Sequence, residues 1–274
     1  MNETLIAEEL ACRFGNVDVV DGISLKAVKG EWLGIVGPNG SGKSTMLRML
    51  ARLIVPDRGS VRLDGDDVRR MNTKSLARRM TMLAQANDPG LDITVRELVR
   101  RGRHPHLKWY EECRGTHEEV VDWALAATKT DLLQHRKLGQ LSGGERQRAW
   151  LAMSMAQTPE LLLLDEPTTY LDIAHQLELM ELIRNLNKER GVTVLMVIHD
   201  LNQAARYCDR IMAVKDGRIA AQGTPAEVFR PAFFRDVFGV EAKVYDDGGV
   251  PVFMPSGIAA LRTSEGERPS GIAW

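Results

Sequence analysis

The chain has few of the residues that mark a secreted, membrane-spanning or nucleic-acid-binding protein. Its 274 residues include only three cysteines, far apart and without a C-x-x-C pair, so a disulfide framework is excluded and a reducing cytosol fits better. A net charge of −1 and an aromatic content of 5% exclude a broad basic or base-stacking surface for nucleic acid.

Long hydrophobic segments are also missing. The longest apolar runs, such as residues 192–198, fall far short of the ~20 residues that a membrane helix needs. The first nine residues are acidic and contain no apolar signal region. We therefore expect any role at a membrane to be peripheral and to depend on a partner.

What the sequence does contain is a glycine-rich loop that fits G-x-x-x-x-G-K-[ST]. An apolar run at 32–36 precedes it and a helical pattern at 44–51 follows, which predicts strand, loop and helix. Glycines let backbone N–H groups converge on phosphate oxygens, and the helix N-terminus adds a positive dipole end. Lys43 would neutralise the β- and γ-phosphates, and the Ser44 hydroxyl would bind Mg²⁺. The weaker alternative is an ordinary glycine-rich turn with a capping serine. The predicted nucleotide contacts are Gly37, Pro38, Asn39, Gly40, Ser41, Gly42, Lys43, Ser44 and Thr45.

Four short apolar runs, at 33–36, 80–84, 161–164 and 192–198, show no alternation. Strands buried on both faces, as in a parallel sheet covered by helices, have this pattern. A residue that could bind a ligand or take part in catalysis follows each run: the loop at Gly37, then Gln85, Asp165 and His199. Because ligands bind at the carboxyl ends of parallel strands, these positions predict one shared site.

The adjacent carboxylates Asp165 and Glu166 suit two different roles in phosphoryl transfer. Asp165 suits Mg²⁺, directly or through water. Glu166 suits a general base that polarises the attacking water. His199 would hydrogen-bond the γ-phosphate and report its loss, although a histidine after a strand is also a common turn residue.

A second glycine turn, Ser142-Gly-Gly-Glu145, precedes a helical pattern at 146–157. Ser142 and Glu145 fit a capping box, so the turn has a purely structural explanation. Two adjacent glycines exceed what a cap requires and cost backbone entropy. They suit a helix N-terminus that meets an anion. Since the first loop already holds one nucleotide, we predict that Ser142, Gly143, Gly144 and Glu145 meet the nucleotide of a partner.

The rest of the chain divides by pattern. Residues 5–14, 22–28 and 59–64 are short, partly alternating and predict antiparallel strands. Residues 86–157 carry helical periodicity and many charges, and predict an inserted helical subdomain. We expect one domain over 1–255, with its core in 1–85 and 158–240, and a weakly ordered tail over 256–274.

These motifs together resemble the ATP-binding-cassette (ABC) ATPases from about residue 5 to 240. Residues 37–45 match the family's Walker A, 161–166 its Walker B, and Leu141-Ser-Gly-Gly-Glu145 its signature motif. The resemblance places Gln85 at the Q-loop, where it would link the γ-phosphate and Mg²⁺ to the surface that meets the membrane subunits. It places Asp172 in the D-loop at 170–172. Phe14 falls at the adenine-stacking aromatic, though it also reads as a half-buried strand residue.

That resemblance implies an α/β fold: a RecA-like P-loop core, an antiparallel β subdomain and an inserted α-helical subdomain. It implies ATP hydrolysis with Mg²⁺, Ser44, Gln85 and Asp165 being the metal ligands and Glu166, His199 and Gln85 the catalytic groups. It also implies that two copies close head to tail over two ATP molecules.

Three segments narrow the resemblance to ATPases of metal-chelate importers: residues 94–106, 142–157 and 167–175. This branch takes up ferric siderophores, haem and cobalamin, and the run Arg-Ala-Trp-Leu-Ala-Met favours ferric siderophores. The implied partners are two permease subunits and, indirectly, an extracytoplasmic binding protein. The implied location is the cytoplasmic face of the inner or plasma membrane, held through the permease.

Two alternatives stay open. One is an ATPase of a haem or cobalamin importer or of another ABC transporter. The other, from a different class, is a soluble ABC ATPase acting on nucleic acid or ribosomes. Proteins of that class usually carry two cassettes or a long coiled-coil insertion, and this chain has one cassette and no basic balance, so we expect no nucleic-acid partner. The cluster Arg96, Arg100, Arg101 and Arg103 is interpreted as a solvated helix face, with contact to the permease or to lipid headgroups as the alternative.

Overall fold

The four unbroken apolar runs form four adjacent strands, β3, β8, β7 and β6, of a six-stranded sheet with the order β10-β9-β3-β8-β7-β6. The computed structural model describes residues 3–83, 91–108, 110–169 and 171–259. The strands β3, β6, β7, β8 and β9 pair in parallel, and β10 closes one edge in the antiparallel sense. Their bounds are β3 Trp32–Val36, β6 Met80–Leu83, β7 Leu161–Asp165, β8 Thr193–Val197, β9 Arg210–Lys215 and β10 Arg218–Gly223. The predicted parallel sheet is confirmed.

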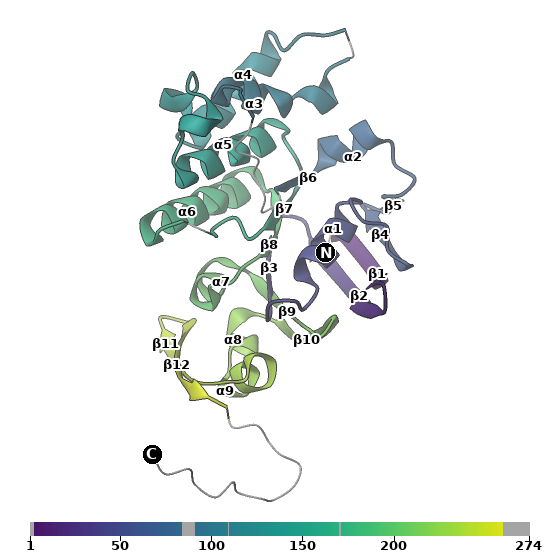
Figure 1. Ribbon diagram of the computed structural model, residues 1–274, viewed down its shortest axis with the longest axis vertical. Helices are drawn as coiled ribbons and strands as arrows, with labels where there is room; N and C mark the ends of the chain where they lie inside the picture. Colours follow the sequence, from purple (N-terminus) through teal and green to yellow (C-terminus); the bar gives the residue numbers. More distant parts are fainter. Residues whose placement is uncertain (1–2, 84–90, 109, 170, 260–274) are drawn as a thin grey trace, which may run out of the picture.

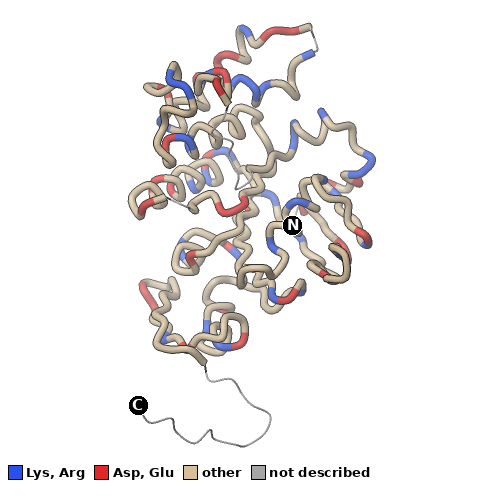
Figure 2. The backbone as a smooth tube through the Cα atoms, viewed as in Figure 1, with Lys and Arg blue, Asp and Glu red and all other residues tan. Residues whose placement is uncertain are grey.

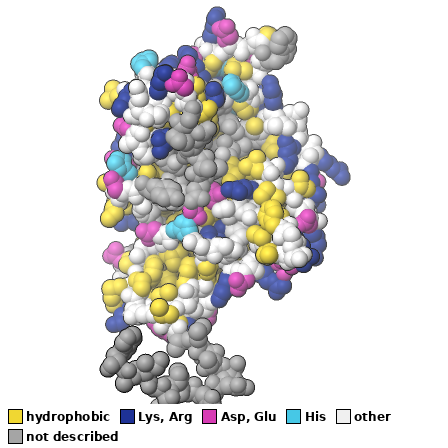
Figure 3. All heavy atoms as spheres, in the orientation of Figure 1, with side chains coloured by type: hydrophobic (Ala, Val, Ile, Leu, Met, Phe, Trp, Pro, Cys, Tyr) yellow, Lys and Arg dark blue, Asp and Glu magenta, His cyan; other side chains and the backbone are white. Residues whose placement is uncertain are grey.

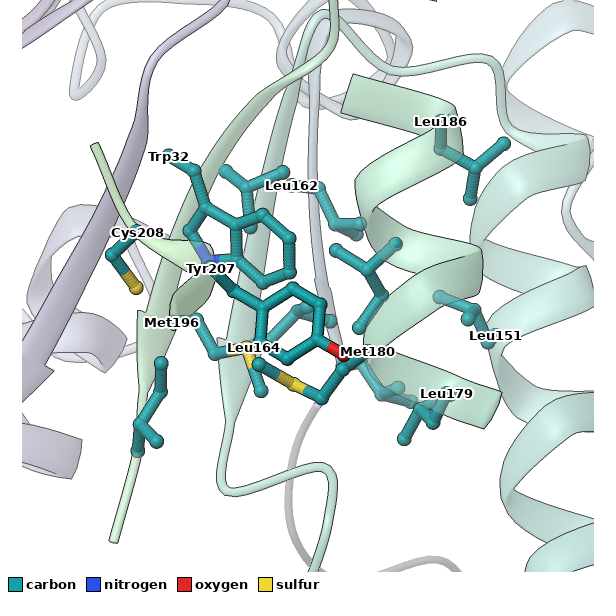
Figure 4. Close-up of a cluster of buried hydrophobic side chains, with 14 of the residues drawn as sticks. Trp32, Leu151, Leu162, Leu164, Leu179, Met180, Leu186, Met196, Tyr207 and Cys208 are labelled. Carbon is teal, nitrogen blue, oxygen red and sulfur yellow. The ribbon is translucent and has the colours of Figure 1, made fainter. Parts of the chain in front are cut away.

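Both faces of this sheet are buried, which explains the missing alternation. Along β7, Leu162 and Leu164 belong to one hydrophobic cluster, and Leu161 and Leu163 belong to the other. On the first face lie α6 (Ile173–Arg190) and α7 (Leu201–Tyr207), and Figure 4 shows Leu162 and Leu164 there with Met180 and Tyr207. On the second face lies α1 (Lys43–Leu50). The sheet is therefore held between two layers, as a parallel sheet must be.

A smaller antiparallel sheet has the order β2-β1-β4-β5. Its strands are β1 Glu3–Phe14, β2 Val17–Val28, β4 Arg58–Leu63 and β5 Asp66–Asp67. Their buried side chains join those of α1 in one cluster, so α1 lies between the two sheets (Figure 1). The antiparallel strands predicted at 5–14, 22–28 and 59–64 are confirmed. The helix α2 (Thr73–Arg79) leads from this sheet into β6.

Three helices lie together at one end of the molecule (Figure 1): α3 (Val95–Arg101), α4 (Thr116–Ala127) and α5 (Gly143–Ala156). Short 3-10 turns at His104–His106, Asp131–Leu133 and Leu138–Gln140 connect them. Figure 2 shows many charged residues in this region.

The arginine cluster on α3 and just after it is less solvated than the sequence suggested. Arg96 and Arg100 both bind Glu118 on α4, each at 2.6 Å. Arg103 is buried and donates to the carbonyl oxygen of Ala156. The interpretation as a solvated face is wrong for Arg96 and Arg103, because helix packing places their charges between helices.

The C-terminal region contains more structure than its sequence pattern indicates. After α8 (Pro225–Val228), α9 (Pro231–Phe233) and a π turn at Phe234–Phe238, the chain forms a hairpin of β11 (Val240–Asp247) and β12 (Val250–Ile258). Phe253 stacks on Phe234 with ring centroids 4.4 Å apart. The Asn202 side chain on α7 accepts a hydrogen bond from the Phe253 backbone N–H at 3.0 Å. On the face seen in Figure 3, apolar side chains gather over this region.

The strand β12 also changes the boundary expected at residue 255. Residues 256–258, predicted to begin a weakly ordered tail, belong to β12, and the rest of that segment beyond 259 lies outside the described residues. None of the helices in the described part of the chain is long and apolar enough to cross a membrane.

The two-sided burial of β7 gives a test of the fold. We expect Leu163→Ala to lower the free energy of unfolding by roughly 2–5 kcal/mol, because the side chain is fully buried and its loss leaves a cavity. Leu53→Ala, at a side chain that is 65% exposed, should change it by less than about 0.5 kcal/mol. Urea denaturation of both variants measures the difference, and equal losses would contradict the described packing.

Candidate active site

The glycine-rich loop is wedged between the two sheets. A Cβ atom on Gly37, whose φ is +147°, would lie 2.0 Å from the carbonyl oxygen of Val214 at the end of β9. A Cβ on Gly42, whose φ is +97°, would lie 2.3 Å from the carbonyl oxygen of Val19 on β2. These two glycines are therefore required by close backbone approach as well as by conformation.

Lys43 begins α1 and is only 5% exposed. Its ammonium group donates hydrogen bonds to the carbonyl oxygens of Gly37 at 2.9 Å and Pro38 at 2.7 Å. Burial lowers the pKa of Lys43, and the nearby carboxylates of Glu166 and Asp165 act in the opposite direction. The lysine is thus held inside the loop, with its charge pointing where phosphate oxygens would approach.

Asp165 ends β7 beside the start of α1. The Ser44 hydroxyl donates to Asp165 Oδ1 at 2.7 Å, so the two predicted metal ligands are in direct contact. Asp165 is 1% exposed, and its Oδ2 has no hydrogen-bond partner within the described parts of the chain. Burial raises the pKa of Asp165. A buried carboxylate oxygen without a partner next to a hydroxyl is a donor set that fits Mg²⁺, which prefers hard oxygen ligands.

Glu166 follows Asp165 with a φ of +53°, a left-handed conformation that is costly for a residue with a side chain. Its Oε1 lies 2.6 Å from His199 Nε2, at the end of β8. Its Oε2 accepts a hydrogen bond from the Thr169 hydroxyl at 3.3 Å. The carboxylate predicted to be the base is therefore positioned by neighbours on both sides.

A cleft of about 380 Å³ contains most of these groups. It is lined by Val19, Asn39, Gly40, Ser41, Gly42, Lys43, Ser44, Thr45, Glu166 and His199. Phe14, at the end of β1, is 54% exposed and is not among the described residues that line this cleft. Gln85 lies outside the described residues.

The second glycine turn starts α5, at the helical end of the molecule, and does not line this cleft. The Ser142 hydroxyl accepts a hydrogen bond from the Glu145 N–H at 3.3 Å, and the Glu145 carboxylate accepts one from the Ser142 N–H at 2.8 Å. The capping box is confirmed, and the helix begins at Gly143, three residues before the predicted start.

The two glycines of this turn have different surroundings. A Cβ on Gly144 would lie 3.1 Å from the His175 ring, so packing within the chain explains this glycine. A Cβ on Gly143 would meet nothing within 4 Å. Only Gly143 therefore supports the argument that the bare backbone is kept for an approaching ligand.

Sequence reasoning named Asp172 but missed His175. Asp172 caps α6 by accepting the His175 N–H at 2.9 Å, and its Oδ1 also lies 2.8 Å from His175 Nδ1. Because the same ring packs on Gly144, it joins the start of α6 to the start of α5. No local pattern marks this contact, since the two segments are about thirty residues apart.

Known proteins with similar sequences and structures share one family. The ABC transporter family model matches residues 20–169. The petrobactin import ATP-binding protein FpuC of Bacillus anthracis is 47% identical over 230 residues, which cover 84% of this chain and 85% of the relative. The ferric enterobactin transport ATP-binding protein FepC of Escherichia coli K12 is 44% identical over 263 residues, covering 95% and 97%. A solved dimer of the ATP-binding cassette MJ0796, bound to ADP and Pi, is 29% identical with a TM-score of 0.69, covering 80% and 98%.

Asp165 leads to a prediction that concerns stability as well as binding. Because burial raises the pKa of Asp165 in the folded state, folding favours its protonated form. The free energy of unfolding that the protonated carboxyl contributes is lost as the pH rises through that pKa. Asp165→Asn keeps an acceptor for Ser44 and removes the buried charge. At pH 7 without Mg²⁺, we expect its melting temperature to exceed that of the wild type, with the gap narrowing in acid.

With Mg²⁺ and ATP the order should reverse, because the wild type gains stability from a ligand that the variant cannot hold. Thermal denaturation with and without Mg–ATP measures both effects. Asp66→Asn, at a side chain that is 68% exposed, is the control and should change neither. An equal gain from Mg–ATP in the wild type and Asp165→Asn would contradict the assignment of the metal ligand.

Proposed function

This chain belongs to the ABC transporter family, and on that basis we propose that it is the ATP-hydrolysing subunit of an importer for iron chelates, most specifically ferric siderophores. The observation that carries the proposal is a cleft lined by Lys43, Ser44 and Glu166, with Asp165 hydrogen-bonded to Ser44 behind it. The relatives of the chain are named for petrobactin and ferric enterobactin transport. The ATPase activity belongs to the family, and the cargo is our proposal.

In the proposed mechanism the loop at 37–45 binds the phosphates of ATP. Lys43 would exchange the two loop carbonyls that it now contacts for the β- and γ-phosphate oxygens. Ser44 and Asp165 would hold Mg²⁺, together with Gln85 as the family resemblance implies. Bound there, Mg²⁺ would supply charge neutralisation at the phosphates.

Glu166 would act as the general base on the attacking water. Its Oε1 lies 2.6 Å from His199 Nε2. We propose that His199 turns to the γ-phosphate when ATP binds, which frees this carboxylate oxygen for the water. His199 would thereby make activation of the base depend on the presence of the γ-phosphate.

We further propose that two copies share each nucleotide. The Ser142-Gly-Gly-Glu145 turn of the same chain is not part of the cleft lining. The open space at Gly143 and the helix N-terminus there suit an anion from another molecule. The turn of one copy would therefore meet the phosphates held by the other.

For the remaining partners, we propose two permease subunits and, through them, an extracytoplasmic binding protein. A hollow of about 1020 Å³ is lined by α2, α3, the start of α4 and parts of 104–108 and 111–115. It shares no lining residue with the nucleotide cleft and offers one surface for the permease. The chain would then lie at the cytoplasmic face of the membrane. Importers of haem or cobalamin remain the alternative cargo class.

The role of Glu166 gives a direct prediction. Glu166→Gln should lower kcat for ATP hydrolysis by roughly 10²- to 10⁴-fold, the usual contribution of a general base, while leaving ATP affinity close to that of the wild type. Phosphate release and ATP titration of the purified chain measure the two quantities. Glu189→Gln on the exposed end of α6 is the control and should hydrolyse ATP normally. Hydrolysis by Glu166→Gln at the wild-type rate would remove Glu166 as the base.

The cargo is tested separately, by uptake of labelled ferric siderophores, haem and cobalamin. Cells that carry Glu166→Gln in place of the wild-type chain should lose uptake of ferric siderophores and keep uptake of the other two. Loss of haem or cobalamin uptake instead would replace the proposed cargo and leave the ATPase assignment intact. Unchanged uptake of all three would contradict the import proposal.

A further inference from the structure

Glu166 belongs to a closed ring of contacts, and two glutamines that no motif includes complete that ring. The Gln176 amide on α6 donates to the carbonyl oxygens of Thr168 at 3.3 Å and Leu171 at 3.1 Å, in the segment that follows Glu166. The Gln203 amide on α7 donates to Gln176 Oε1 at 2.9 Å. The bridge therefore joins the segment after β7 to the helix after β8.

The other half of the ring passes through Asp200 and His199. The Asp200 carboxylate caps α7 by accepting the backbone N–H groups of Asn202 at 2.9 Å and Gln203 at 3.1 Å. His199, its neighbour, contacts Glu166 at 2.6 Å. Thr169 returns to Glu166 from the other side.

Chemistry fixes the orientation of both amides. Carbonyl oxygens only accept hydrogen bonds, so Gln176 must turn its Nε2 toward Thr168 and Leu171 and its Oε1 toward α7. Gln203 must then present its Nε2 to that oxygen. This leaves Gln203 Oε1 buried with no hydrogen-bond partner among the residues that the structure describes.

An unsatisfied buried acceptor costs stability, and Gln203 is 91% buried. An apolar side chain of the same shape would avoid that cost. A residue kept only for packing would therefore not need to be glutamine. What glutamine adds here is the single donor that connects α7 to Gln176.

The ring encloses a residue in a costly conformation. Glu166 has a φ of +53°. A residue keeps such a conformation only when contacts with its surroundings hold it there. We infer that the Gln176–Gln203 bridge is a positioning pair. It fixes the backbone at Thr168 and Leu171 relative to α7 and His199, so that the Glu166 carboxylate is aimed for catalysis. This inference rests on the proposed role of Glu166 as the base.

The test uses the full-length chain and the variants Gln203→Met and Gln176→Met, which keep side-chain volume and remove the bridge. We expect kcat for ATP hydrolysis to fall roughly 10- to 100-fold in each, with KM for ATP little changed, because the loop at 37–45 is untouched. The double variant should be no slower than the slower single variant, since both remove the same link. Melting temperatures should stay within roughly 4 °C of the wild type.

Asn187→Leu is the matched control. Asn187 lies on α6 about 16 Å from Gln176 along the helix. Its amide donates to the carbonyl oxygens of Gly30 and Val192, both at 2.8 Å, and its Oδ1 also lacks a partner in the described chain. It should keep a normal kcat whatever its effect on melting temperature.

Glu166→Gln, measured beside these variants, separates the two possible failures. If Glu166→Gln is inactive but both methionine variants hydrolyse ATP at the wild-type rate, the positioning role is wrong and the base assignment stands. If Glu166→Gln is active, the base assignment itself is wrong. If the methionine variants lose kcat only in proportion to a lowered melting temperature, as Asn187→Leu then also would, the bridge is merely structural. Should Gln203→Met fail to fold, Gln176→Met carries the test, because its side chain is only partly buried.

Discussion

The constraint on which the site depends is the burial of charge at the carboxyl ends of β3 and β7. Lys43 and Asp165 are almost inaccessible, and Glu166 is adjacent in sequence to Asp165. Burial lowers the pKa of Lys43 and raises that of Asp165, because the charged form of each is less stable there than in water. Hydrogen bonds from Lys43 to loop carbonyls and from Ser44 to Asp165 offset part of this cost. Phosphate and a divalent cation would complete that compensation, which explains why binding sites of this kind favour Mg–ATP.

The residues that line the cleft and the second glycine turn come from different parts of the fold. The loop, the two carboxylates and His199 come from strand ends of a single sheet, whereas the Ser142-Gly-Gly-Glu145 turn is fixed to a separate group of helices. His175 contacts both Asp172 and Gly144, so the turn and the start of α6 are joined. A partner that presses on either would act on both. In the proposed shared site, this link would let a second copy act on the turn and on the start of α6 together.

Much of this was predictable from the sequence, and the reasons are local. Continuous apolar runs revealed strands buried on both faces, and the loop motif has a fixed spacing because phosphate geometry demands it. The hairpin β11–β12 was missed because Phe234 and Phe253, whose stacking holds it, are distant in sequence. Arg103 was misread as solvated because its burial depends on a carbonyl more than fifty residues away. His175 and the Gln176–Gln203 bridge were also missed, since contacts between helices leave no periodic pattern.

The measurement that tests the shared site most directly is sedimentation of Glu166→Gln with Mg–ATP, with and without the added change Ser142→Arg. The account predicts dimers for Glu166→Gln alone and monomers for the double variant, with equal ATP binding in both. An arginine at position 142 would block the turn from meeting the other copy's nucleotide without touching the loop at 37–45. Dimers of equal strength in both variants would contradict the claim that each nucleotide is held between two copies.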